Sequence, residues 1–415
     1  MRSLGEPSFW KATANTTARI LAAGTLSSLA GIALGALAYR FRLVKEAMFA
    51  PLQVMKSAPV ACVIVIVLVA WGSAGALVTI VAFVAFPPFY VNMAQALEAR
   101  PRQAETVLRL AGVSKVRVFA ACIWPAALPF FVAASKTAVA LSWRAGITAE
   151  LLCLPMDSLG SAVYASKLTL DSGNLLALTI VVMVLSWACE KAVVAVLQLT
   201  GRTARLAVRG DKGAASSVSP EAAGSGSAAI VMEEVRKGYD DNRVLEAFAL
   251  RVEPGERVCL MAPTGSGKST AIAVMLGAAT ADSGSVRAPE RFGAMLQTAS
   301  LVDGLTACEN VLLAAGSGVT EQQAREALRE LLPQDACDRK PGELSGGMKR
   351  LTEIVRAMLS DGQAIVLDEP FAGLDEESHL KACAFILENL HGRPLVVATH
   401  DRSDVDLLNA QAVGV

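Results

Sequence analysis

The sequence has no cysteines paired in the CxxC pattern, although it contains eight cysteines. Four of them fall in or beside apolar stretches, namely Cys62, Cys122, Cys153 and Cys189. This scatter excludes a disulfide framework and a zinc site built from closely spaced thiolates. We interpret each cysteine as a small buried hydrophobic residue, and we expect the chain to be reduced and cytoplasmic wherever it leaves a membrane.

Charge is also scarce, at 18% of residues, whereas 53% of residues are hydrophobic and the mean hydropathy is +0.46. Such a chain is too apolar for an ordinary soluble protein, so part of it is expected to lie in lipid. Residues 1–199 hold sixteen basic and eight acidic residues, and residues 200–415 hold twenty-two and thirty. This division excludes a single globular core. The basic residues flank apolar runs, which argues against a nucleic-acid partner.

Long runs without charge predict the membrane part. Residues 20–39 form the first run, and about twenty helical residues cross a hydrocarbon layer of about 30 Å. Residues 57–97 are long enough for two spans, with a turn predicted at the glycines 72 and 75. Runs within residues 118–152 and at residues 172–189 bring the expected number of spans to five.

The first run admits an alternative interpretation as a signal peptide, because Ala-Leu-Ala stands at residues 36–38. A signal peptide has only about 7 to 15 apolar residues, and membrane sequence follows here, so we favour a retained helix. Ser27, Gly31 and Gly35 recur at every fourth position of this helix. Such small residues allow a second helix to approach closely in lipid.

Basic residues set the expected orientation. They cluster between spans one and two and between spans three and four, as Arg40, Arg42, Lys45, Lys56, Arg100, Arg102, Arg109, Lys115 and Arg117. Both loops should be cytoplasmic, because cytoplasmic loops are enriched in Lys and Arg. We therefore expect a multi-pass protein of the cell (inner) membrane, with its second half in the cytoplasm and its N-terminus outside.

Three ionisable residues interrupt the run at residues 118–152, where charged groups are costly and often line a pathway. We expect Arg144 and Glu150 to pair with other groups or to reach the membrane interface. Lys136 lies nearer the middle of the helix, so a pathway role and a structural role are equally open for it.

Residues 200–229 are rich in Gly, Ser and Ala and cannot bury enough apolar surface to order themselves. We interpret them as a flexible linker. The chain then divides into an α-helical transmembrane domain at residues 1–199, this linker, and a nucleotide-binding domain at residues 230–415.

A glycine-rich loop stands between an apolar strand at residues 257–261 and a helical run at residues 271–277, which is the context of a P-loop. Its backbone N–H groups and lysine bind phosphate, and its hydroxyl ligates Mg²⁺. Ala262 replaces the usual first glycine, which requires a negative φ there. The predicted ATP-binding residues of the loop are Thr264, Gly265, Ser266, Gly267, Lys268, Ser269 and Thr270.

A second apolar strand at residues 364–367 ends in two carboxylates. We expect Asp368 to hold Mg²⁺ and Glu369 to polarise the attacking water as a catalytic residue. A strand end that is merely acidic is the alternative, and the P-loop about a hundred residues earlier argues against it. The second half is therefore expected to be an α/β P-loop ATPase domain.

The sequence Leu-Ser-Gly-Gly-Met at residues 344–348 resembles the signature motif of ATP-binding cassette (ABC) proteins, and residues 230–404 are similar to that family. The resemblance implies further ATP contacts at Ser345, Gly346 and Gly347 of the signature, at Asp375 of the D-loop, and at Tyr239, which stacks on adenine. It implies that Gln297 reaches ATP and joins Ser269 and Asp368 at the metal. His400 corresponds to the catalytic switch histidine, whereas His379 and His391 are expected at the surface.

Two cassettes must close face to face in this family, so that each ATP lies between the Lys268 of one chain and the Ser345 of the other. The signature then opens a helix whose N-terminus faces the γ-phosphate. Because the chain has one cassette and one membrane domain, we infer a homodimer.

Residues 110–129 are similar to the coupling motif of binding-protein-dependent importer permeases, with Gly112 and Pro125 spaced as in that family. Thr106, Val107 and Leu108 stand where that family has Glu-Ala-Ala. Short motifs at residues 51–52, 71–72 and 149–151 look like the taurine, nitrate and sulfonate branch. The resemblance implies an amphipathic helix near residues 98–114 that inserts in a cleft of the cassette.

Three functions fit these features. The first is a fused half-importer that hydrolyses ATP and takes up a small polar solute, of the sulfonate, nitrate or thiamine-precursor class, from an extracytoplasmic solute-binding protein. The second is an ABC exporter or lipid flippase, for which the cytoplasmic loops are too short. The third is a membrane-tethered ATPase without transport, which leaves the five spans and the coupling motif unexplained. We favour the importer.

Overall fold

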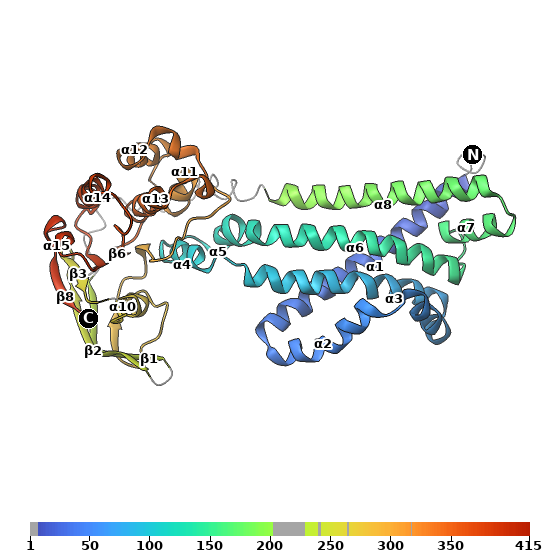
Figure 1. Cartoon of the computed structure of the whole chain (residues 1–415), viewed down its shortest axis with the longest axis horizontal. Coiled ribbons are helices and arrows are strands. Elements are labelled where there is room, and N and C mark those ends of the chain that lie inside the picture. The colour runs from blue at the N-terminus through green and yellow to red at the C-terminus, as the bar shows by residue number, and fades with distance from the viewer. Residues whose placement is uncertain (1–6, 202–228, 240–241, 264, 317) are drawn as a thin grey trace. The chain divides into compact units, whose positions relative to one another are not determined.

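The computed structural model describes residues 7–201, 229–239, 242–263, 265–316 and 318–415 (Figure 1). They form two compact units, which are described separately. Unit 1 comprises Met1–Arg100 and Ala126–Arg202, and unit 2 comprises Pro101–Pro125 and Thr203–Val415. The segment 101–125, which lies between apolar helices in the sequence, therefore belongs to the same compact unit as the second half. Nearly all of the predicted linker lies outside the described residues.

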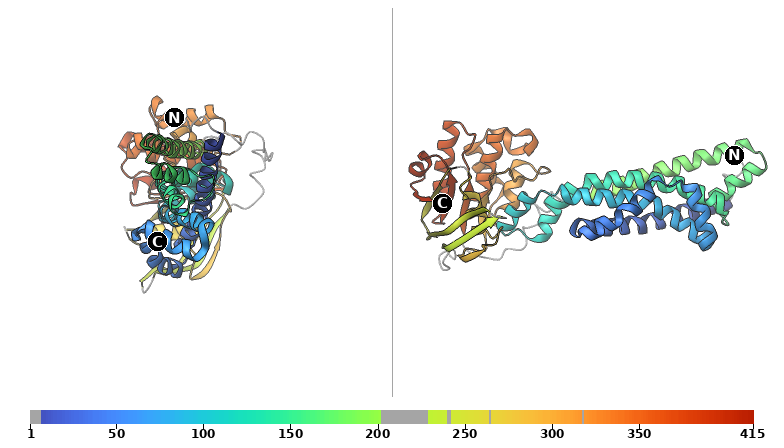
Figure 2. Two further views of the ribbon diagram at one scale, coloured as in Figure 1. Left: turned by 90° about the vertical axis from the view of Figure 1, so that its right-hand side faces the viewer. Right: turned by 60° about the horizontal axis from the view of Figure 1, so that its bottom comes forward.

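Unit 1 is a bundle of long helices that lie lengthwise along one another (Figures 1 and 2). Its helices are α1 (Pro7–Arg40), α2 (Arg42–Ser57), α3 (Val60–Glu98), α6 (Trp124–Cys153), α7 (Leu159–Leu168) and α8 (Ser172–Thr200). Four helices of the described chain are long and apolar enough to span a membrane: Pro7–Arg40, Gly75–Glu98, Lys115–Cys153 and Ser172–Thr200. A bent pair, Arg42–Ser57 with Val60–Ser73, brings the number to five if it counts as one span.

The predicted number of about five spans is thus confirmed, but the second predicted span is built differently. The expected basic loop after the first span is largely helical and forms α2. This helix meets Val60–Ser73 at 109°. The predicted turn near residues 72–75 is confirmed, because Gly72 has φ of +72° and interrupts α3. Ile64 before the break packs in one apolar cluster with Leu77 and Ile80 after it, so the chain folds back here.

The small residues of α1 serve close packing, as predicted. A Cβ added at Gly31 would lie 2.9 Å from the Phe86 carbonyl oxygen of α3, and one added at Gly35 would lie 2.7 Å from that of Tyr90. Ser27 Oγ donates a hydrogen bond of 2.7 Å to the Ala82 carbonyl. Small side chains on α1 therefore allow α1 and α3 to come into backbone contact. Such close van der Waals packing stabilises helix association in lipid, where there is no hydrophobic driving force between helices.

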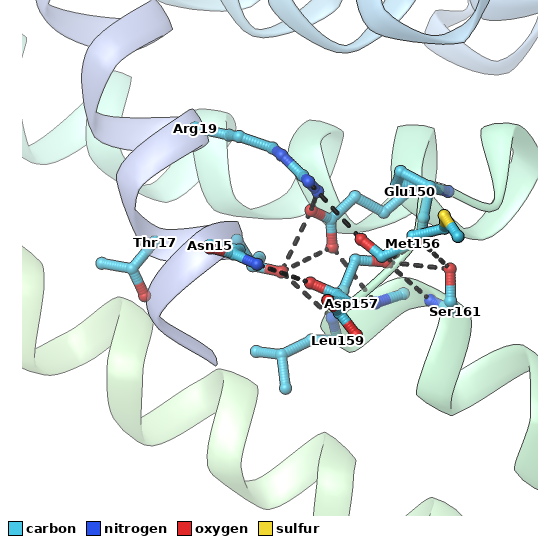
Figure 3. A network of polar contacts seen from close by, with 12 residues as sticks. Asn15, Thr17, Arg19, Glu150, Met156, Asp157, Leu159 and Ser161 are labelled. Atoms are coloured by element: carbon cyan, nitrogen blue, oxygen red, sulfur yellow. Dashed lines mark hydrogen bonds and ion pairs between the residues drawn. The ribbon is translucent and has the colours of Figure 1, made fainter. Parts of the chain in front are cut away.

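Glu150 is buried and fully engaged, which confirms its expected structural role (Figure 3). Thr16 Oγ1 lies 3.0 and 2.9 Å from its two carboxylate oxygens, Arg19 Nη1 lies 3.4 Å away, and the Gly160 N–H donates at 3.1 Å. The carboxylate thus joins α1, the end of α6 and the start of α7. Arg144 is exposed, and its side chain has no hydrogen bond or ion pair with a described residue, so the predicted pairing is not seen and its reach to the membrane interface stays a prediction.

Unit 2 contains two sheets. An antiparallel sheet has the order β2-β1-β4, and a parallel sheet has the order β5-β6-β7-β3-β8. The strands are β1 (Ile230–Tyr239), β2 (Asn242–Val252), β3 (Arg257–Met261), β4 (Ser283–Arg287), β5 (Phe292–Met295), β6 (Ala364–Asp368), β7 (Leu395–Thr399) and β8 (Gln411–Gly414). Strands β6 and β7 are buried throughout, as is typical of a parallel sheet covered on both faces.

The principal helices of the second half of unit 2 are α10 (Lys268–Met275), α11 (Ala307–Ala314), α12 (Glu321–Leu331), α13 (Gly346–Met358), α14 (Glu376–Asn389) and α15 (Ser403–Leu407). The strands predicted at residues 257–261 and 364–367 are confirmed as β3 and β6. The helix predicted from residue 271 begins three residues earlier, at Lys268. The parallel strands end in loops at one edge of the sheet, where crossover topology concentrates binding residues.

Candidate functional site

The P-loop joins the end of β3 to the start of α10. Gly265 and Gly267 have φ of +87° and +102°, a left-handed conformation that glycine adopts without strain. A Cβ at Gly267 would also lie 2.9 Å from Val244 of β2. Ala262 is absent from the residues of positive φ, as its side chain requires. Thr264, another predicted ATP-binding residue, lies outside the described residues.

Lys268 is 6% exposed at the first turn of α10. Its Nζ donates hydrogen bonds to the carbonyl oxygens of Ala262 and Pro263, the second at 3.2 Å. The ammonium is therefore held over its own loop, beside the N–H groups at the helix start. Ser266 Oγ is buried without a hydrogen-bond partner in the described structure. These donors together form a site for an anion such as a phosphate group.

Ser269 and Asp368 come together from different elements. The Ser269 hydroxyl donates to the Asp368 carboxylate, whose Oδ1 is buried and has no hydrogen-bond partner among the described atoms. Burial raises the pKa of Asp368, and the hydrogen bond from Ser269 partly opposes this shift. A hydroxyl beside an unsatisfied carboxylate oxygen is a donor set that suits Mg²⁺.

Glu369 has an unusual backbone for a residue other than glycine, with φ of +49°. Its N–H donates to the Ala398 carbonyl of β7 at 2.9 Å. Its side chain meets Gln297, whose Nε2 lies 3.5 Å from Oε2. Gln297 follows β5 and is exposed. The structure thus brings Gln297 and Glu369 together, and Asp368 precedes Glu369 on the same strand end.

Arg350 on α13 is a functional candidate that sequence reasoning missed. Its guanidinium donates to the Glu369 carbonyl through Nη1 and to the Gln297 carbonyl at 3.4 Å through Nη2. These contacts hold both chain segments in place by their backbones. The only sequence signal is a basic residue in the second turn of the signature helix, and that signal does not reveal its partners.

His400 is exposed directly after β7. Because Asp368 pairs with Ala398 across the sheet, His400 lies at the same strand edge as the two carboxylates. The expectation of a surface position for His379 is wrong. Its Nε2 lies 2.7 Å from the buried Asp404 carboxylate, and its ring packs against Phe371 with centroids 4.5 Å apart. The register of α14 turns His379 inward, whereas His391 is exposed.

The signature residues form a second group of site candidates. Ser345 caps α13 by accepting a hydrogen bond of 3.2 Å from the Met348 N–H. Gly346 is exposed, and a Cβ at Gly347 would contact Leu374 of the neighbouring loop. Asp375 caps α14 by accepting from the Ser378 N–H at 2.7 Å, and this bond lowers the pKa of Asp375. Tyr239 ends β1 and is 51% exposed, with Lys237 Nζ 5.4 Å from its ring centre.

Residues 101–125 add a further surface to unit 2. The predicted amphipathic helix is confirmed as α4 (Arg102–Leu110), followed by α5 (Lys115–Val118) and a π-helical turn, Phe119–Ile123. Leu108 and Val118, each 1% exposed, pack in one cluster with Val302, Leu305 and Leu313 of the second half. Gly112 fits closely there, because a Cβ would lie 2.7 Å from the Arg291 side chain. The segment is therefore seated on the nucleotide domain by an apolar face.

Two family models match the chain. The model described as "ABC transporter" matches residues 245–372, and the model described as "Binding-protein-dependent transport system inner membrane component" matches residues 27–199. The first covers the loop with Lys268, Gln297, the signature and the strand end with Glu369. The second covers most of the described spans. Both halves of the chain are thus matched separately.

Curated relatives include transporter components of two kinds. The Nod factor export ATP-binding protein I of Burkholderia pseudomallei (strain 1710b) is 34% identical over 199 residues, which are 44% of this chain and 66% of the relative. The aliphatic sulfonates import ATP-binding protein SsuB of Granulibacter bethesdensis is 31% identical over 186 residues, which are 44% of this chain and 78% of the relative. The chain spans slightly less than two thirds of the Nod factor relative.

Solved structures also resemble part of the chain. A dimeric post-hydrolysis state of the ATP-binding cassette MJ0796 bound to ADP and Pi has 25% identity and a TM-score of 0.40, and the match covers 43% of this chain and 90% of that chain. A further dimeric structure of MJ0796, described as a bacterial ABC transporter cassette, has 26% identity and a TM-score of 0.40 over 45% of this chain.

Proposed function

The chain belongs to the ABC transporter family, with a permease and an ATPase in one polypeptide, and on that premise we propose that it is a fused half-importer. It would take up a small polar solute of the sulfonate, nitrate or thiamine-precursor class from an extracytoplasmic solute-binding protein. The membrane is the cell (inner) membrane, and the ATPase domain lies in the cytoplasm. The match to the binding-protein-dependent permease model and the sulfonate import relatives support this direction.

We assign the nucleotide to the P-loop edge. Tyr239 stacks on the adenine, residues 264–270 wrap the phosphates, and Lys268 leaves its own loop carbonyls to meet the β- and γ-oxygens. Ser269, Gln297 and Asp368 would hold Mg²⁺, which supplies charge neutralisation of the phosphates. The unsatisfied Asp368 oxygen beside the Ser269 hydroxyl supports this fit.

Glu369 is the proposed catalytic residue. Its carboxylate orients and polarises the attacking water, and Gln297 lies beside it. His400 lies at the same strand edge, where it would contact the γ-phosphate of ATP. The positive φ of Glu369 is an uncommon backbone conformation for a residue with a side chain, and such strain tends to occur at functional sites.

A second copy completes the site. Ser345, Gly346, Gly347 and Asp375 lie at exposed or partly exposed helix starts, so they are available to the ATP that another chain holds. Donors at a helix N-terminus suit a γ-phosphate. We therefore propose a homodimer with two ATP molecules at its cytoplasmic interface.

One observation carries the transport proposal: the apolar face of α4 and α5 is buried on the ATPase half. The segment is continuous with the membrane helices on both sides in the sequence, since α3 precedes it and α6 follows it. A movement of the nucleotide domain would therefore be transmitted through the contact of α4 and α5 to both α3 and α6. A tethered ATPase without transport has no use for such a seat.

An exporter is the second candidate, because the Nod factor relatives are named for export. Vesicles that contain the purified chain, with ATP on the cassette side, separate the two functions. We expect solute to accumulate on the cassette side only when a solute-binding protein is present on the opposite face. Flux that is equal without a binding protein, or that runs toward the opposite face, would favour export.

A further inference from the structure

Two basic side chains on α6 are exposed inside a helix of membrane-spanning length. Lys136 and Arg144 lie in Lys115–Cys153, one of the apolar helices long enough to cross a membrane. Neither side chain has a hydrogen bond or an ion pair with any described residue. A cation that faced hydrocarbon from such a position would be costly. The face of α6 that carries these residues is therefore not expected to face lipid.

The two residues share one face of the helix. Eight residues along an α-helix correspond to a rise of about 12 Å and a net rotation of about 80°. Thr137 and Ala133 are exposed on the same face. We call Lys136, Thr137 and Arg144 the basic stripe. The opposite face is buried, and it contains Ala134, Ser135, Ala138, Ser142, Ala145, Gly146 and Ala149.

Packing fixes the direction of this stripe. A Cβ at Gly146 would lie 2.7 Å from Ile20 of α1 and 3.5 Å from Val81 of α3, so α6 cannot rotate to bury Lys136 and Arg144 against these helices without losing that fit. Lys136 also lies near the middle of Trp124–Cys153, where its side chain cannot reach either end of the span. Snorkelling is thus a poor account of Lys136.

Counter-charges within unit 1 do not account for the stripe. The four long spans and the bent pair contain four carboxylates, at Glu46, Glu98, Glu150 and Glu190, and Glu46 pairs with Arg42. Glu150 is occupied by Thr16, Arg19 and the Gly160 N–H. Glu98 is the last residue of α3 and has no ion pair with Lys136 or Arg144 in the described structure. Glu190 on α8 is the remaining candidate in these spans, and it forms no ion pair with Lys136 or Arg144 in the described structure.

We infer that the basic stripe lines a water-filled path for a small anion with an oxygen-bearing headgroup, such as an alkanesulfonate or nitrate. A lysine ammonium provides a point charge, and an arginine guanidinium binds such oxygens in a planar fork. The Thr137 hydroxyl donates to the Ala133 carbonyl of its own helix at 3.2 Å, so the two basic side chains supply the donors. This inference rests on the proposed function, because a second copy must close the other side of the path. It selects the anionic solutes and excludes the neutral thiamine precursor.

Thiol labelling of Thr137→Cys in lipid nanodiscs tests the stripe without needing transport. The full chain is treated with an anionic reagent, sulfonatoethyl methanethiosulfonate, and with a cationic one, trimethylammonioethyl methanethiosulfonate. The rate of each is taken as the increment over the parent chain with its native cysteines. Nearby cations raise thiol reactivity toward both reagents, so the ratio of the two rates reports the local preference for anions.

Relative to the same ratio for a free thiol, we expect the ratio of the anionic to the cationic rate to be on the order of tenfold higher, because a positive field concentrates anions locally. Adding Lys136→Gln and Arg144→Gln to Thr137→Cys should bring the ratio close to that of a free thiol, whereas adding Arg144→Lys should preserve most of it. Leu29→Cys, exposed on α1 within its span, is the matched control and should react with neither reagent.

Two outcomes overturn the inference. No reaction of Thr137→Cys with either reagent would place the stripe in lipid or in a dry contact. Reaction without an anionic preference would assign the stripe to a neutral channel, and a preference that emerges only after Glu190→Gln is added would assign the stripe to an ion pair with Glu190. A failure of ATP-driven solute uptake in wild-type vesicles is a separate result, because it overturns the proposed function and leaves the labelling ratio unaffected.

Discussion

At the scale of single residues, Glu369 carries the chemical prediction. Glu369→Gln keeps the size of the side chain and its contact with Gln297, but removes the negative charge that polarises water. We expect ATP binding to be retained and turnover to fall by about 100-fold or more, the range of a general base. Steady-state ATPase rates and equilibrium ATP binding, both in lipid, measure the two quantities.

Glu377→Gln is a matched control, since Glu377 is exposed in the first turn of α14 and forms only a surface ion pair with Lys381. This variant should keep both ATP binding and turnover. Wild-type turnover in Glu369→Gln would show that another group activates the water.

Three buried thiols give a prediction for pH. Burial raises the pKa of Cys259, Cys308 and Cys383 to about 12, from an ordinary value of 9.0. As pH rises from 9 toward 12, these thiols ionise in the unfolded chain but stay protonated in the folded one. Stability is therefore fully present below pH 9 and falls as pH increases, by up to about 1.4 kcal/mol per thiol for each pH unit.

The unfolding temperature of the nucleotide domain is measured between about pH 8 and pH 11, where the protonation of the thiols differs between the folded and the unfolded chain. It should decrease more steeply with pH in the wild type than in a variant with all three cysteines replaced by alanine. The comparison uses slopes, because the alanines also lower stability by loss of packing. Parallel slopes would mean that the thiols are accessible to ionisation in the folded chain.

At the scale of elements, the contact of α4 with the nucleotide domain carries the prediction for the coupling of ATP hydrolysis to transport. Leu108 is 1% exposed in the cluster with Leu305 and Leu313. Leu108→Ala removes about 2 to 5 kcal/mol of packing, which weakens the attachment of α4. We expect ATPase activity to persist while the solute transported per ATP falls. Paired measurements of hydrolysis and uptake in vesicles give this ratio.

Val116→Ala in the neighbouring α5 is the control, since Val116 is 77% exposed and should tolerate the change. If both variants left the ratio unchanged, the seat of α4 would not transmit motion. If Leu108→Ala abolished hydrolysis and uptake together, a general loss of folding would be the better explanation.

Elements whose signals are local could be predicted from the sequence. The strands before Lys268 and before Asp368, and the helix near residues 98–114, follow from short runs of residues and were confirmed. The helix α2 was not predicted, because four basic residues in a stretch between apolar runs are typical of a loop. Its helicity depends on apolar contacts with α1 and α3, such as that of Leu52 with Tyr90 in one cluster.

The candidate site likewise contains residues that short motifs reveal and contacts between distant residues that they do not. Lys268, Ser269, Asp368 and Glu369 are neighbours in short motifs, so their types and spacing were enough to select them. The contacts of Arg350 with Glu369 and Gln297 join residues 19 and 53 positions apart, and no motif encodes such a distance. His379 was misplaced for the same reason, since its partner Asp404 lies on another helix.

At the scale of the whole molecule, the proposed dimer makes a complementation prediction. Lys268→Ala removes one chain's P-loop function, and Ser345→Arg blocks one chain's signature. Each homodimer should be inactive. A heterodimer of the two variants, isolated with different tags, contains one intact pairing of Lys268 with Ser345, and we expect about half the wild-type ATPase rate.

The matched control is a heterodimer in which one chain carries both substitutions and the other chain is unchanged. Each of its two sites then combines one intact and one altered part, so it should be inactive. An active control together with an inactive complementing pair would mean that each chain uses its own P-loop and signature on one ATP.

The seat of α4 also has a consequence for biosynthesis. Leu108 and Val118 leave the ribosome about 190 residues before Val302, Leu305 and Leu313, which cover them in the finished protein. At about 5 to 20 residues per second, this apolar face waits for roughly 10 to 40 seconds beside a newly inserted membrane segment. During this interval a chaperone, the bilayer surface or a neighbouring nascent chain must shield it, so slow translation of residues 126–314 should lower the yield of correctly assembled protein.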